Sequence, residues 1–167
     1  MDAVQFFYQN EIAEDDLRAS QMSYASNALC GIAFHEAGHA VVARYFGLKV
    51  IEIEIREDAS GKIDTVGTTD ALPLIDRLAI HCAGQASRTV FKCRSHALAV
   101  SGDDIEISKL VDGLADAQRL EIRNAGYRRA IEIVKSNAPE VERLASLLIE
   151  QRRINESTIA QAVILVA

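Results

Sequence analysis

The sequence predicts a mainly α-helical domain with a small β-hairpin. Ala, Leu and Ile are abundant, aromatic residues make up only 5% of the chain and Trp is absent, a composition that favours the packing of helices. Apolar residues recur at helical spacing over most of the chain, whereas Lys49–Arg56 alternates apolar with polar residues as a half-buried strand does. With 167 residues, 49% hydrophobic and 25% charged, the chain is expected to fold as one domain, 1–167, around a buried core.

The N-terminal elements follow from local signals. Residues 4–24 are polar enough for one or two short peripheral helices. A longer helix is expected to begin near Ala25–Asn27, where a Ser or Asn can cap it, and to end at Gly47, a residue suited to terminating a helix. Lys49–Arg56 then forms a strand, and Lys62–Thr68 returns as its hairpin partner after a glycine-containing turn.

The C-terminal half is predicted to be helical. Pro73 opens a helix that runs to about Cys93, and a loop follows over Ser95–Gly102. Three more helices are expected over residues 103–135, with a bend near Gly113, then 138–151 and 156–166. Residues 1–26 thus form a peripheral helical segment and residues 27–163 the core of the domain.

The most informative stretch is His35-Glu36-Ala37-Gly38-His39, an HExxH motif within the long apolar helix. Residues four apart lie on one face of a helix, so His35 and His39 can hold a single metal ion. Glu36 is turned by about 100° from His35, which places its carboxylate beside the ligands and not among them. Zinc held in this way keeps a position for water, and the neighbouring carboxylate can take that water's proton. The motif therefore predicts a hydrolytic zinc site with Glu36 as the general base.

An alternative is that these three polar residues are solvated positions of an amphipathic helix. The chain has four histidines, and two of them fall in this motif. Apolar residues recur around them at helical spacing, which predicts a buried helix: Phe34, Ala37, Val41, Tyr45 and Leu48. A buried helix needs a reason to carry two histidines and a glutamate, and this favours the metal site.

Charge and cysteine content argue against several classes of protein. The net charge of −6 disfavours nucleic acid as a partner, because phosphate binding needs clustered Lys and Arg. No apolar run is long enough to span a bilayer, and the acidic N-terminus lacks the pattern of a signal peptide. Three cysteines without a CxxC pair fit a reducing cytoplasm. A second metal site built from His81-Cys82, Cys93 and His96 is disfavoured for the same lack of paired cysteines.

A catalytic zinc site needs a third protein ligand. The metzincin pattern is excluded, because no histidine follows His39 at the required spacing. Glu106, on a downstream helix, is one candidate. Asp103 and Asp104 are two others, since they stand where a loop meets the start of a helix and one can cap while the other ligates.

The run from Phe34 to Ala43 resembles the zinc motif in the protease domain of FtsH, the family of membrane-anchored, ATP-dependent AAA+ metalloproteases. The likeness covers roughly residues 27–163 and includes three further segments: Thr65-Val66-Gly67-Thr68, Ala83-Gly84-Gln85-Ala86 and Ser101-Gly102-Asp103-Asp104-Ile105. The last is similar to the family segment that carries the third zinc ligand, and the correspondence falls on Asp104. The resemblance thus implies an FtsH peptidase-like helical fold with Zn²⁺ held by His35, His39 and Asp104.

The chain also departs from this family. It contains no GxxxxGK[ST] phosphate-binding motif, and Arg88-Thr89 stands where the family has paired glutamates near the site. The resemblance implies a stand-alone zinc endopeptidase that acts on unfolded proteins or peptides, with a separate AAA+ ATPase or further copies of this chain as candidate partners. By analogy, an extended substrate is expected to lie along the edge of the Lys49–Arg56 hairpin, with its backbone paired to the strand.

A rival hypothesis comes from a different class of protein. The chain could be a non-proteolytic binding or regulatory module that retains zinc for structure. An intact Glu36 counts against this rival, because a purely structural zinc site has no use for a base and usually fills its fourth position with a protein ligand.

Overall fold

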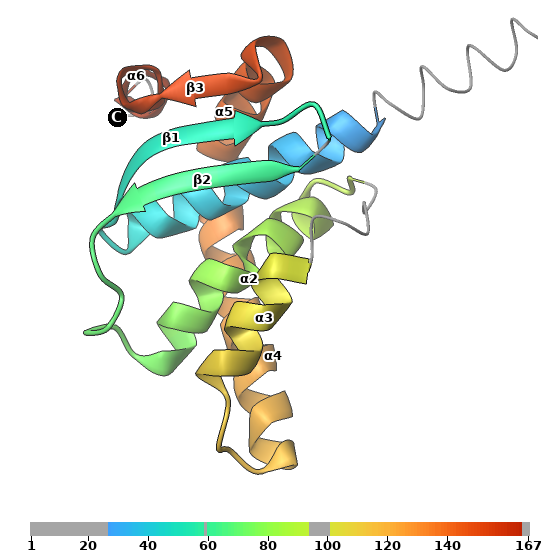
Figure 1. Cartoon of the computed structure of the whole chain (residues 1–167), viewed down its shortest axis with the longest axis vertical. Helices are drawn as coiled ribbons and strands as arrows, with labels where there is room; N and C mark the ends of the chain where they lie inside the picture. The colour runs from blue at the N-terminus through green and yellow to red at the C-terminus, as the bar shows by residue number, and fades with distance from the viewer. Residues whose placement is uncertain (1–26, 59, 94–100, 165–167) are drawn as a thin grey trace, which may run out of the picture.

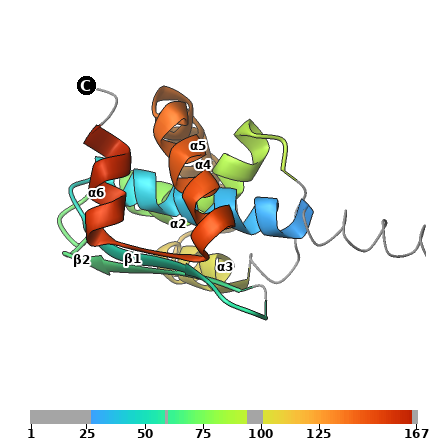
Figure 2. The same ribbon diagram turned by 90° about the horizontal axis from the view of Figure 1, so that it is seen from above.

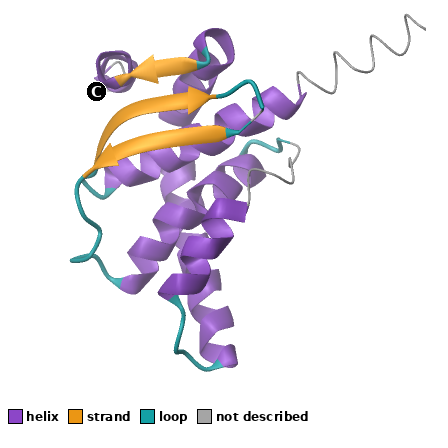
Figure 3. Ribbon diagram, in the orientation of Figure 1, coloured by secondary structure: helices purple, strands orange, loops and turns teal. Residues whose placement is uncertain are grey.

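The computed structural model describes residues 27–58, 60–93 and 101–164 (Figure 1). The peripheral segment expected over residues 1–26, the start of the long helix and most of the expected loop before Asp103 lie outside these residues. Within them the fold is mainly helical with a small three-stranded antiparallel sheet, which confirms the predicted fold class (Figure 3). No helix in this described part of the chain is both long enough and apolar enough to cross a bilayer.

The helix that carries the HExxH run, hereafter the motif helix, is described over residues 27–45. Residues 31–43 are buried, except for the half-buried Phe34. A helix that is buried all round needs packing partners on every side. The sheet covers one face of the motif helix and other helices cover the opposite face (Figure 2). The HExxH residues are therefore interior residues, as the apolar flanks predict.

The motif helix terminates at Gly47, as predicted. Gly47 has a φ of 83°, its N–H donates to the Arg44 carbonyl at 2.9 Å, and the N–H of Leu48 donates to the Ala43 carbonyl at 3.0 Å. These two bonds around a left-handed residue form a Schellman termination. Tyr45 was predicted to be a core residue, but it is 52% exposed, and its ring packs under the guanidinium of Arg129 at the surface.

The sheet contains one strand more than the predicted hairpin. Strands β1 (Lys49–Ile55) and β2 (Gly61–Val66) pair antiparallel, and β3 (Arg153–Asn155) pairs antiparallel with the other side of β1. The order is β2-β1-β3, so β1 is the central strand (Figure 1). β1 itself offers no edge to a substrate, because β2 and β3 occupy its two sides, so the edge of the expected hairpin is the outer side of β2. The two outer strands of the sheet are β2 and β3.

The helices agree with the predicted segments except in one place. Helix α2 (Leu74–Val90) follows Pro73, and α5 (Ala138–Gln151) and α6 (Glu156–Ile164) lie where the sequence places them. The long helix expected over residues 103–135 is two helices, α3 (Ser101–Leu110) and α4 (Asp116–Ser136). Gly113, with a φ of 83°, lies between them, so the predicted bend is a complete break.

Candidate metal centre

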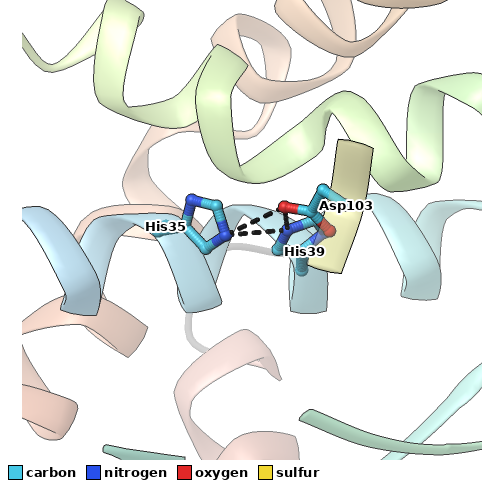
Figure 4. A group of neighbouring side chains, drawn as sticks. All are labelled: His35, His39 and Asp103. Atoms are coloured by element: carbon cyan, nitrogen blue, oxygen red, sulfur yellow. Dashed lines mark hydrogen bonds and ion pairs between the residues drawn. The ribbon is translucent and has the colours of Figure 1, made fainter. Parts of the chain in front are cut away.

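Three polar side chains from two helices point toward one another in the interior (Figure 4). His35 and His39 come from one face of the motif helix, and Asp103 comes from the first turn of α3. Asp103 Oδ2 lies 3.1 Å from His35 Nε2 and 3.0 Å from His39 Nε2. The two imidazole nitrogens are 3.2 Å apart. The motif helix thus presents both rings to a single point, as their spacing of four residues predicts.

This donor set fits Zn²⁺. Two imidazole nitrogens and one carboxylate oxygen are typical ligands of a catalytic zinc site that keeps its fourth position for water. Bonds of about 2.0–2.1 Å in a tetrahedral arrangement place ligand atoms about 3.3–3.4 Å apart, close to the 3.0, 3.1 and 3.2 Å found here. Among the described residues, no second group of three His, Cys, Asp or Glu side chains converges in this way. His96, of the disfavoured second site, lies outside those residues.

The third position of this group is occupied by Asp103 and not by Asp104. Asp104 has a side chain that is 55% exposed, and its Oδ1 lies 3.7 Å from Nη2 of Arg123 on α4. Consecutive helical residues point about 100° apart, so only one of the two aspartates can face the histidines. Ile107 and Val111, both buried, follow Asp103 by four and eight residues and turn its side of α3 inward. The expectation that Asp104 meets the two histidines is therefore corrected, because Asp103 lies there and is the candidate third ligand.

Burial and charge pairing set the protonation of this group. Burial lowers the pKa of His35 to about 4, so its ring is neutral at pH 7. Burial alone would lower the pKa of His39 as well, but attraction to the Asp103 carboxylate raises it to about 9. The same pairing holds the pKa of Asp103 well below its usual range although burial opposes this. With His35 neutral and His39 protonated, the group carries one positive charge next to the Asp103 carboxylate. A divalent cation bound to two neutral imidazoles can replace the proton on His39.

Glu36 lies beside this group, as its position in the motif predicts. Its side chain is buried and lines the same cavity as the three convergent side chains. Burial raises the pKa of Glu36 to about 7, against the opposing effect of the His39 charge. A Cβ at Gly61, the first residue of β2, would overlap the Glu36 carboxyl group. Because Gly61 has no side chain, the Glu36 carboxylate can occupy this space at the start of β2.

A cavity of about 470 Å³ opens over the centre. Its polar end carries Glu36 and the three convergent side chains, and residues 60–63 and 65, in and next to β2, form one wall. Ala43, Leu48 and Ile80 add apolar surface to the lining. Glu106, a candidate third ligand, also lines the cavity, but its Oε1 accepts a hydrogen bond from Lys109 Nζ at 2.7 Å. Glu106 therefore lines the cavity wall and is not one of the three convergent side chains.

His35 is held in place by packing. His35 Nδ1 is buried and has no hydrogen-bond partner among the described residues, whereas His39 Nδ1 lies 2.9 Å from the Ile80 carbonyl of α2. A Cβ on Gly84 would overlap the His35 ring, so the bare backbone of α2 forms the surface on which this ring rests. The sequence shows both glycines, but it contains no signal that pairs Gly84 with His35 or Gly61 with Glu36, because these contacts join separate elements.

Gly84→Ala is expected to weaken zinc binding about 10- to 100-fold, because overpacking a buried position costs about 1–3 kcal/mol and here displaces a ligand ring. Ala favours helix over Gly, so helix propensity cannot cause the loss. Gly61→Ala should instead crowd Glu36, which is not one of the three convergent side chains, and leave zinc affinity at the parental value. Competition with a zinc-binding dye measures the affinities, with Gln85→Ala, an exposed site on α2, as the control. Parental zinc affinity in Gly84→Ala would show that the ring does not rest on α2.

The chain is similar to one known family. Residues 21–90, less than half of the chain, match the family described as Peptidase M50B-like. The matched segment contains the HExxH run, β1, β2 and α2, and it ends before Asp103. This similarity supports a domain of the zinc-metallopeptidase type. The matched family is that of site-2 proteases and is distinct from FtsH, so the similarity supports the peptidase class and not the FtsH assignment. No curated protein matches the chain.

Proposed function

We propose that this chain is a zinc-dependent endopeptidase that hydrolyses peptide bonds in unfolded proteins or peptides. The observation that carries the proposal is the juxtaposition of Glu36 with the convergent atoms of His35, His39 and Asp103 at one end of an open cavity. A structural zinc site would be closed by a fourth protein ligand, and here the fourth side faces the cavity beside a buried carboxylate. The proposal includes the resemblance of residues 34–43 and 101–105 to FtsH. The approach of α3 to the motif helix brings these two segments together and supports this part of the proposal.

The proposed reaction assigns a role to each of these side chains. His35, His39 and Asp103 would hold Zn²⁺, which as a Lewis acid polarises a carbonyl and makes water more acidic. Glu36 takes a proton from the attacking water as the water oxygen bonds to the carbonyl carbon. Glu36 then gives that proton to the amide nitrogen as the carbon–nitrogen bond breaks. The first products are a carboxylic acid and an amine, and Glu36 returns to its starting state. The acid becomes a carboxylate by releasing the second proton of the water to solvent.

The free edge of β2 is the proposed binding surface for the substrate backbone. Gly61, Lys62 and Ile63 line the cavity next to Glu36, and β2 pairs with β1 on its other side. An extended peptide that adds to this edge by main-chain hydrogen bonds passes directly over the catalytic group. Pairing with an edge strand requires an extended backbone, which folded proteins rarely offer. This supports unfolded chains or short peptides as substrates.

The remaining parts of the proposal come from the sequence. A separate AAA+ ATPase would supply unfolded chains, further copies of this chain could form a homo-oligomer, and the protein would act in the cytoplasm. The acidic net charge of −6 supports a protein substrate over nucleic acid.

The test of the proposed function is zinc content together with cleavage. The purified chain is expected to carry one zinc ion per molecule and to cleave casein, an unfolded protein, while a folded protein of the same size stays intact. Removing the zinc with a chelator should abolish cleavage, and adding zinc back should restore it. A chain that holds one zinc ion but cleaves no unfolded substrate would support the structural module instead. A chain that binds no zinc would overturn both hypotheses.

A further inference from the structure

His81 is a third imidazole in the cavity, outside the group that would hold zinc. It follows Ile80 on α2, and the Ile80 carbonyl lies 2.9 Å from His39 Nδ1. His81 and Gly84 are three residues apart and so share one face of α2. Gly84 on that face rests against the His35 ring. The backbone of α2 therefore directs His81 to the side on which the centre lies, and its side chain lines the same cavity as Glu36 and Asp103.

The surroundings of His81 suit a hydrogen-bond donor to a substrate. The side chain is half-buried, and Glu106 on α3 lines the cavity with it. Burial lowers the pKa of His81, so the ring is neutral at pH 7. A neutral imidazole donates through one nitrogen and needs no charge to do so. The reaction proposed above gives Glu36 the proton transfers, which leaves the donor capacity of His81 unused.

We propose that His81 is a further catalytic residue, which donates a hydrogen bond to the substrate carbonyl oxygen as that oxygen gains negative charge. This inference rests on the proposed peptidase function. When the water oxygen bonds to the carbonyl carbon, the carbonyl π electrons move to the oxygen, and a preorganised N–H stabilises the resulting charge. The electrons return to re-form the carbonyl when the carbon–nitrogen bond breaks. His81 keeps its proton throughout, so proton transfer remains with Glu36.

The test compares substrate turnover, zinc content and binding of a transition-state mimic. Removing one donor of this kind typically lowers kcat about 10²–10³-fold, so His81→Ala is expected to lose kcat to this extent while KM and zinc content keep parental values. His81→Gln, which retains an N–H donor, should recover part of the loss. The substrate is a casein peptide that the parent cleaves. Its phosphonamidate analogue, with a tetrahedral anionic group at the scissile bond, should bind His81→Ala more weakly than the parent by a similar factor.

Gln85→Ala, at an exposed position of α2 one turn further on that does not line the cavity, is the matched control and should behave as the parent in every assay. If the parent cleaves casein but His81→Ala keeps the parental kcat and analogue affinity, this inference is wrong and the proposed function stands. A loss of zinc together with activity in His81→Ala, without rescue by His81→Gln, would assign the residue a structural role and also overturn the inference. A zinc-loaded parent that cleaves nothing would overturn the inference and the proposed function together.

Discussion

Glu36→Gln is expected to keep its zinc and its fold but to cleave casein about 10²–10⁴-fold more slowly than the parent, the usual effect of losing a general base. Gln matches Glu in shape and fits the space beside Gly61, but its amide cannot accept the proton of the attacking water. Because Glu36 lies beside the three convergent atoms and is not one of them, its loss should leave the metal in place. Single-turnover cleavage rates and zinc content, measured on the same preparation, test this expectation.

His39→Ala is the control that separates the two roles at this site. It removes one of the three convergent atoms, so zinc and activity should be lost together. Thermal unfolding of Glu36→Gln should remain close to that of the parent, since no contact is removed and no cavity is created. A Glu36→Gln protein that cleaves casein as fast as the parent would refute the assignment of the base.

Asp103→Asn is expected to lower zinc affinity strongly. The loss should exceed the factor of about 10–100 that removal of an outer hydrogen-bond partner of a metal ligand costs. The substitution removes the negative charge that faces both histidines at 3.1 and 3.0 Å. The amide that replaces it is a poorer ligand for zinc than a carboxylate. Titration with a competing chelator gives the affinity, and activity should fall in parallel with zinc content.

Asp104→Asn is the matched control, because it makes the same chemical change one residue further along α3. Its carboxylate contacts Arg123 at 3.7 Å at the surface, so zinc affinity should stay at the parental value. Exposed ion pairs contribute about 0–1 kcal/mol to stability, which predicts little change in thermal unfolding. The opposite pattern, with zinc lost from Asp104→Asn and retained by Asp103→Asn, would restore the ligand implied by the FtsH resemblance.

The position of the third convergent residue shows where sequence reasoning stopped. Correspondence with a family segment selects Asp104, the residue directly before Ile105. The helical pattern of this chain selects Asp103, because Ile107 and Val111 follow it on one face while Ile105 is 56% exposed. The signal was thus present in the sequence. It becomes decisive only when the rotation of α3 about its own axis is known, and packing sets that rotation.

The role of β1 has a similar explanation. Its alternating pattern predicts a strand with one buried face, and Ile53 and Ile55 are buried as this pattern requires. Val50 is buried although it is out of phase with them, and the pairing with β2 shifts register between Val50 and Glu52. The pattern does not say how many neighbours the strand has. β3 is only three residues long and pairs with β1 from about a hundred residues further along the chain, so local periodicity could not reveal it. Its pairing closes the second side of β1, so the proposed substrate surface is the outer edge of β2.

By itself the sequence determined the features that depend on local spacing. The two histidines of the motif share a face, Glu36 stands beside them, Gly47 ends the helix, and the helical class of the fold follows from apolar periodicity. Only the tertiary structure decided which aspartate meets the histidines, which strands form the edges of the sheet, and which side chains lie against Gly61 and Gly84. The physical reason is that these features depend on how separate elements approach one another. Contacts between distant segments are set by close packing of the whole core, whereas spacing within one helix is set by its own hydrogen bonds.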